Sequence, residues 1–188
     1  MSAALFTDTR YLVRGRALSV FGRLCVQDSE GQLIAFGVLR AEWSKRSITL
    51  LRPGNPEAEI LSIRLRPGSN ISDVVDARSA QRVGALQRAY WVPFARDQWT
   101  ILDADDRELG VVREESTALS WLKRLWPEVI PRRYRGEVEE RTVCTLRQLF
   151  SPFAMKIQVD VSDDFTEVLD RRLVIAVALL LCELGHLG

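Results

Sequence analysis

Residues 169–187 read LDRRLVIAVALLLCELGHL, and every position from Leu173 to Cys182 is apolar. A helix at a protein surface carries one apolar stripe, whereas a helix that is apolar all round must be surrounded on every side. A membrane span needs about 20 apolar residues, and shorter runs are typical of buried core helices. Arg171, Arg172 and Glu183 close this run at its two ends. The stretch therefore predicts a helix wrapped by the rest of the protein, and no transmembrane span.

Length and composition predict one soluble globular domain over residues 1–188, with 47% apolar and 27% charged residues. The net charge of +1 gives no overall basic field, so we expect no nucleic-acid partner. The three cysteines, Cys25, Cys144 and Cys182, are scattered and odd in number, which favours a reducing compartment. Residues 1–10 contain Asp8 and lack the apolar core of a secretory signal. We therefore expect a cytoplasmic protein, with the inner membrane face as the surface it could touch peripherally.

Between Tyr11 and Ser162 the sequence is mostly organised in short strands, because apolar and polar residues alternate with a period of two. A weak repeat runs through this part, in which a strand ends in Asp, a polar turn follows and a second strand returns. Asp28, Asp76 and Asp103 occupy this position in the three copies. An Asp side chain accepts hydrogen bonds from the backbone of its own turn, so we interpret all three as turn formers rather than catalytic groups.

Two helices interrupt or follow the strands. Residues 116–126 place apolar side chains on one face, and Pro127 ends the pattern, which predicts a short surface helix. Asp164 and Glu167 have the spacing of a capping box and predict the start of the C-terminal helix, with Gly185 just past its end.

About a dozen short strands indicate a sandwich or a barrel. A barrel of that many strands is too wide for its own side chains to fill. A helix without a polar face can fill it. The predicted fold is therefore mainly β: a closed antiparallel barrel of about twelve strands around the buried C-terminal helix, plus the short surface helix.

This combination resembles the tubby-like superfamily, and more closely its phospholipid scramblase and LURP-one-related branch. The likeness rests on RYLVR at 10–14 with the hairpin at 18–28, on the strand–Asp–turn–Gly pattern at 75–84 and 101–110, and on LDRRL at 169–173. It implies a twelve-stranded barrel around a central helix. It also implies phosphoinositide binding or movement of lipid between leaflets.

The chain departs from the animal scramblases in several features. It has no long proline-rich N-terminal arm and no run of cysteines to accept palmitate. The acidic stretch from Asp160 matches a calcium loop only in part, because Phe165 stands where the loop needs Gly and Arg171 where it needs Glu. We expect no metal site there.

Known catalytic arrangements are missing from the sequence. His186 is the only histidine and lies at the end of the chain, and no Cys/His cluster has zinc spacing. Asp103, Asp105 and Asp106 form a compact acidic group, which we interpret as a solvated turn. We therefore expect no enzyme activity and no cofactor.

The strongest candidate for function is a basic cluster within a helix–loop–strand stretch. Its candidate lipid- or phosphate-binding residues are Lys123, Arg124, Arg132, Arg133 and Arg135, and its candidate membrane-interface residues are Trp121, Trp126 and Tyr134. In the alternative interpretation the tryptophans pack the helix onto the barrel and the cations are only solvated. A second, weaker patch combines Lys45, Arg46, Arg64 and Arg66.

These observations lead to one functional hypothesis and two alternatives. The hypothesis is a non-enzymatic domain of the scramblase-like family that binds phosphoinositides or other anionic phospholipids, or acts as an adaptor. The alternatives are a protein–protein interaction module without a lipid role, and true phospholipid scrambling.

Overall fold

A computed structural model of the protein describes residues 5–16, 23–42, 45–89, 97–115, 131–151, 154–164 and 168–184. Within these ranges the chain forms twelve strands followed by one helix. In chain order they are β1 (Arg10–Arg16), β2 (Arg23–Gln27), β3 (Leu33–Glu42), β4 (Lys45–Arg52), β5 (Asn55–Leu65), β6 (Ile71–Asp76), β7 (Arg82–Arg88), β8 (Gln98–Leu102), β9 (Glu108–Glu114), β10 (Arg133–Val138), β11 (Arg141–Leu149), β12 (Ala154–Asp160) and α1 (Arg171–Leu184). The predicted surface helix at 116–126 lies outside the described residues.

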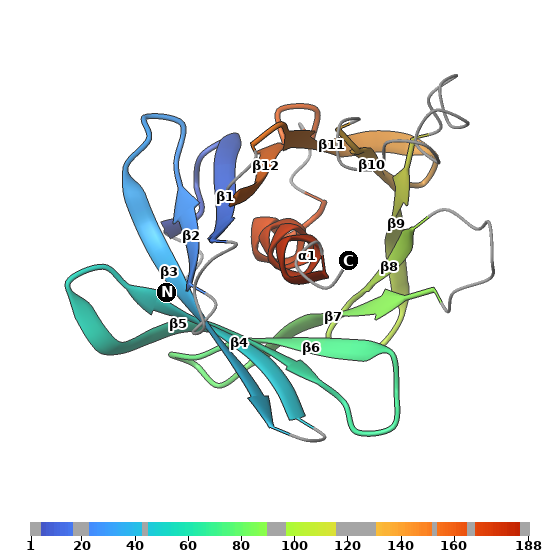
Figure 1. Cartoon of the computed structure of the whole chain (residues 1–188). Coiled ribbons are helices and arrows are strands. Elements are labelled where there is room, and N and C mark those ends of the chain that lie inside the picture. The colour runs from blue at the N-terminus through green and yellow to red at the C-terminus, as the bar shows by residue number, and fades with distance from the viewer. Residues whose placement is uncertain are drawn as a thin grey trace.

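The strands form one closed antiparallel barrel, in which each strand pairs with its neighbours along the chain. The ring closes where β1 pairs with β12, with Tyr11 opposite Val159 and Val13 opposite Ile157. Figure 1 shows this ring with α1 at its centre. The predicted mainly-β barrel around a C-terminal helix is therefore confirmed.

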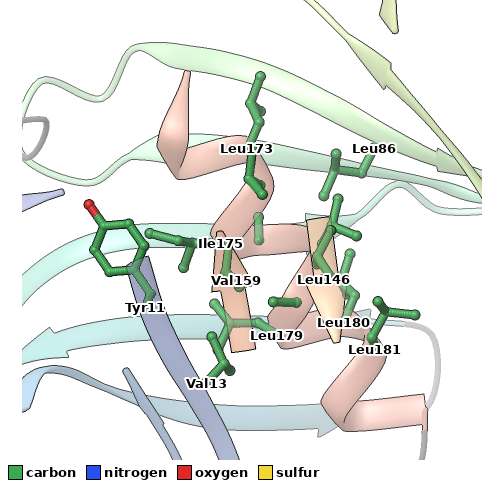
Figure 2. Packing of buried hydrophobic residues seen from close by; sticks show 14 of the residues in the cluster. Tyr11, Val13, Leu86, Leu146, Val159, Leu173, Ile175, Leu179, Leu180 and Leu181 are labelled. Carbon is green, nitrogen blue, oxygen red and sulfur yellow. The ribbon is translucent and has the colours of Figure 1, made fainter. Parts of the chain in front are cut away.

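Helix α1 fills the barrel as its apolar sequence predicts. All residues from Leu173 to Cys182 are buried, and Ile175 and Leu179 are fully inaccessible to solvent. The helix contacts β1 and β12 as well as β6 and β7, so strands on different sides of the ring enclose it. Figure 2 shows its side chains packed among Val13 of β1 and other inward-facing apolar residues of the wall.

The start of α1 differs from the prediction. The helix begins at Arg171, and Asp170 is its cap: its Oδ1 accepts a hydrogen bond from the Arg172 N–H at 2.9 Å, and its carbonyl oxygen accepts one from Leu173 at 2.9 Å. Asp164 instead accepts the N–H groups of Val168 and Leu169. The expected capping box at Asp164 is therefore wrong, because this carboxylate organises the connection that leads from β12 to the helix.

The turns agree with the prediction for the three aspartates. Asp28 and Asp103 each accept two backbone N–H groups of their own turns through Oδ1. Asp76 does the same with Arg78 and Ser79, and its Oδ2 also accepts a 2.8 Å hydrogen bond from Arg172 of α1. It is thus both a turn former and an anchor for the central helix.

A two-residue turn joins β10, which ends at Val138, to β11, which begins at Arg141. Glu139 and Glu140 form the turn, with φ of 48° and 64°. Two successive residues of positive φ are typical of the tight turn that matches the twist of a hairpin.

Candidate functional site

Part of the predicted basic cluster lies in the described structure. Arg132 precedes β10, and Arg133 and Arg135 lie within it. Lys123 and Arg124, together with Trp121 and Trp126, lie outside the described residues.

Successive side chains of strand β10 point to opposite faces of the barrel wall, so Tyr134 lies on a different face from Arg133 and Arg135. Tyr134 is only 2% exposed and belongs to the core, whereas Arg133 and Arg135 on either side of it are exposed. Burial raises the pKa of Tyr134 to about 12, against the opposing effect of the Arg132 guanidinium. Tyr134 therefore does not lie at the surface, and its predicted place at a membrane interface is wrong.

The arginines differ in how far their charges are neutralised. Nη2 of Arg135 lies 2.7 Å from Oε1 of Glu115, and Nη1 of Arg132 lies 3.6 Å from Oδ2 of Asp97. Arg133 has no ion-pair partner among the residues that the structure describes. Of the three, Arg133 is thus the one whose charge no described acidic side chain neutralises.

Strand register adds cations that the sequence analysis did not select. Arg133 lies directly opposite Arg147 of β11, and Lys156 of β12 lies directly opposite Arg14 of β1. These side chains point outward, because their strand neighbours point into the core. We define the basic face as Arg14, Lys156, Arg147, Arg133 and Arg135, which lie on the consecutive strands β1, β12, β11 and β10.

The charges of the basic face are not arranged for stability. Like charges directly opposite each other on neighbouring strands are destabilising, and the face contains two such pairs, Arg133 with Arg147 and Arg14 with Lys156. Within the described ranges, Arg135 is the only one of its five cations with an ion-pair partner. Such a surface attracts an anion, and two neighbouring guanidinium groups can each form paired hydrogen bonds to phosphate.

An exposed aromatic side chain lies at the end of the basic face. Phe150 is 68% exposed and follows Leu149, whose register partner in β12 is Lys156. A large apolar side chain beside cations suits the boundary between water and lipid. Phe150 is therefore an exposed aromatic residue beside the basic face, whereas Tyr134 is buried.

The second predicted patch does not exist as a cluster of free charges. Arg66 is held by Asp73 and Asp106 at 2.8 Å each, and the Arg64 side chain donates to Ser62. Nε of Arg46 lies 3.7 Å from the buried carboxylate of Glu183. Lys45 has no described side chain.

The described part of the chain contains neither a membrane-spanning helix nor a metal-binding cluster. No helix there has both the length and the apolar character needed to cross a bilayer. No three acidic, histidine or cysteine side chains among these residues gather closely enough to hold a metal ion.

Comparison with known proteins relates the chain to others through its fold. No family model matches the sequence, and no curated protein matches it. The structure is similar to the X-ray structure of the protein AT5G01750 from Arabidopsis thaliana, with a TM-score of 0.53 and 10% sequence identity over 97% of this chain and 96% of the other. This likeness shows a shared fold. It agrees with the barrel that the resemblance to the tubby-like superfamily implies.

Proposed function

We propose that the protein is a non-enzymatic, peripheral membrane-binding domain of the scramblase-like, LURP-one-related kind, which binds anionic phospholipid headgroups. The observation that carries this proposal is the basic face, where Arg133, Arg147, Lys156 and Arg14 lie on neighbouring strands without described acidic partners. Their mutual repulsion lowers the stability of the free protein, and anionic headgroups relieve it.

The expected mode of binding combines charge with a small apolar contact. Each Lys or Arg near an anionic membrane contributes about 1 kcal/mol. Phe150, at the end of the face, inserts its ring at the level of the headgroups. Because the attraction is screened over about 8 Å at physiological ionic strength, binding weakens as salt is added.

The double variant Arg133→Gln with Arg147→Gln tests the proposal. Removal of two charges lowers the partition coefficient onto phosphatidylserine or phosphoinositide vesicles about 30-fold, on the basis of about 1 kcal/mol per cation. Vesicle flotation at low and at physiological salt measures this effect. The single variant Phe150→Ser is also expected to weaken binding to the vesicles. The factor by which its affinity falls is expected to be the same at low and at physiological salt.

The matched control is Arg40→Gln with Arg64→Gln, which removes the same charge from exposed positions on β3 and β5. The control is expected to bind as the original protein does. If the original chain does not float with anionic vesicles at low salt, or if both double variants lose the same affinity, the basic face is not a lipid-binding surface. A protein–protein interaction module then becomes the better explanation.

A further inference from the structure

One end of the barrel contains a cavity that the basic face does not include. It has a volume of about 270 Å³ and lies between the C-terminal end of α1 and the wall formed by β4 to β8. Its apolar lining consists of Ile48, Ile63, Leu65 and Leu180. Cavities that bind small ligands have volumes of about 300–1,000 Å³, so this one suits a group of few atoms rather than a complete lipid.

Two residues of the lining, Trp99 and Glu183, each carry a polar side-chain atom that is buried without a hydrogen-bond partner among the described residues. The atoms are Nε1 of Trp99, whose residue is 3% exposed, and Oε1 of Glu183, whose residue is 8% exposed. A buried donor or acceptor left unpaired costs about 1–3 kcal/mol. One atom is a donor and the other an acceptor, so a ligand that satisfies both must offer an acceptor and a donor.

The charges around the cavity narrow the class of ligand further. Nε of Arg46 lies 3.7 Å from Oε1 of Glu183, which is too far for a hydrogen bond. Arg88 is bound to Asp97 at 2.9 Å and lies over the Trp99 ring. Burial raises the pKa of Glu183, and the nearby Arg46 opposes this shift.

A ligand that carries only positive or only negative charge would be repelled by one of the two charged side chains, Arg46 or Glu183. A bare cation that reaches Glu183 approaches Arg46, and a bare anion that reaches Arg46 approaches Glu183. A zwitterion satisfies both groups. Its cation also makes a charge-assisted hydrogen bond, which is about twice as strong as a neutral one.

We infer that this cavity binds a zwitterionic group in which a primary amine lies close to a phosphate. The ammonium donates a hydrogen bond to Oε1 of Glu183. A phosphate oxygen accepts from Nε1 of Trp99 and pairs with Arg46, while the carbon atoms contact Ile63 and Leu180. The group is either a free aminophosphate or the head of an amine-bearing phospholipid. This site is distinct from the basic face and does not depend on the membrane contact proposed above.

The indole N–H resonance of Trp99 in a ¹H–¹⁵N spectrum reports on the site directly, and Trp99→Phe assigns it. Titration with O-phosphoethanolamine is expected to shift this resonance saturably, and so is titration with dihexanoyl phosphatidylethanolamine below its micelle concentration. Phosphocholine carries methyl groups in place of the N–H donors, so we expect no saturable shift with it. Saturation by the lipid but not by the soluble compound assigns the site to lipid headgroups, and the reverse assigns it to a free metabolite.

Variants separate the two hydrogen bonds, with calorimetry as the readout. Glu183→Gln keeps the shape of the side chain and removes the buried charge, so we expect this variant to fold. We expect it to bind at least tenfold more weakly whichever of the two amine probes binds to the original protein. Trp99→Phe keeps an aromatic ring and is expected to weaken binding several-fold. The matched control is Glu137→Gln. Glu137 of β10 lies 3.8 Å from Arg113 of β9, and its replacement is expected to leave the affinity for the probe unchanged.

The inference is overturned if neither amine probe shifts the Trp99 resonance at millimolar concentration. It is equally overturned if phosphocholine binds as tightly as phosphoethanolamine, or if Glu183→Gln binds with the affinity of the original protein. The soluble probe needs no membrane, so each of these results leaves the flotation test of the basic face unaffected.

Discussion

A chain that ends at Val168 is expected to be insoluble, because it lacks the helix that fills the barrel. Residues 173–182 of that helix are all buried. Fully burying a side chain of this kind contributes about 1.5–3 kcal/mol, so the helix provides gross stabilisation larger than the usual net stability of a domain, about 5–15 kcal/mol. Without the helix, the inward-facing side chains of the strands would line a lumen open to water. The fraction of protein in the soluble extract measures this effect.

The control for this deletion is a chain that ends at Leu184 and keeps all of α1. It is expected to elute as a folded protein in gel filtration, with the near-ultraviolet circular dichroism of the complete chain. If the chain that ends at Val168 also purified as a folded monomer, the filled barrel would be the wrong description.

Replacing Asp76 by Asn is expected to lower the free energy of unfolding by about 2 kcal/mol, because a hydrogen-bonded ion pair is lost while Arg172 keeps Asp170, whose Oδ2 lies 2.6 Å from its Nη2. The Asp76 side chain is 8% exposed and lies 2.8 Å from Nη1 of Arg172, which is itself 16% exposed. The amide keeps the shape and the acceptor for the turn N–H groups of Arg78 and Ser79. The change therefore acts mainly on the link between β6 and the first turn of α1. Urea denaturation measures it.

Asp73→Asn is the matched control on the same strand. Asp73 is 27% exposed and shares Arg66 and Arg82 with Asp106. Ion pairs open to solvent contribute about 1 kcal/mol or less, so the control is expected to lose little stability. Equal losses in the two variants would show that the buried pair does not anchor the helix.

The architecture could be predicted from the sequence because local patterns of apolar and polar residues determine it. Ten consecutive apolar residues between charged ends exclude both a surface helix and a membrane span, and period-two alternation marks the strands. The start of α1 could not be predicted from spacing alone. Asp164 and Asp170 are both good capping residues, and the choice depends on how far the chain must travel from β12 to the axis of the barrel.

The candidate surface could be predicted only in part, because it depends on strand register. Arg133 and Arg135 alternate with Tyr134, and this alternation could have assigned the tyrosine to the opposite face. Arg147 and Lys156 join them only when β11 and β12 are paired residue by residue. The cavity depends on side chains from several strands and the helix end, and no local pattern brings Trp99 and Glu183 together.

The central claim is that α1 lies inside the closed barrel, and nuclear Overhauser effects between methyl groups test it most directly. Strands β1 and β7 lie on opposite sides of the ring, with five strands between them in either direction. A helix at the centre is near both, so we predict cross-peaks from α1 to Val13 of β1 and to Leu86 of β7 within one molecule. Cross-peaks to one side of the ring only, or cross-peaks between differently labelled molecules in an isotope-filtered experiment, would contradict this structure.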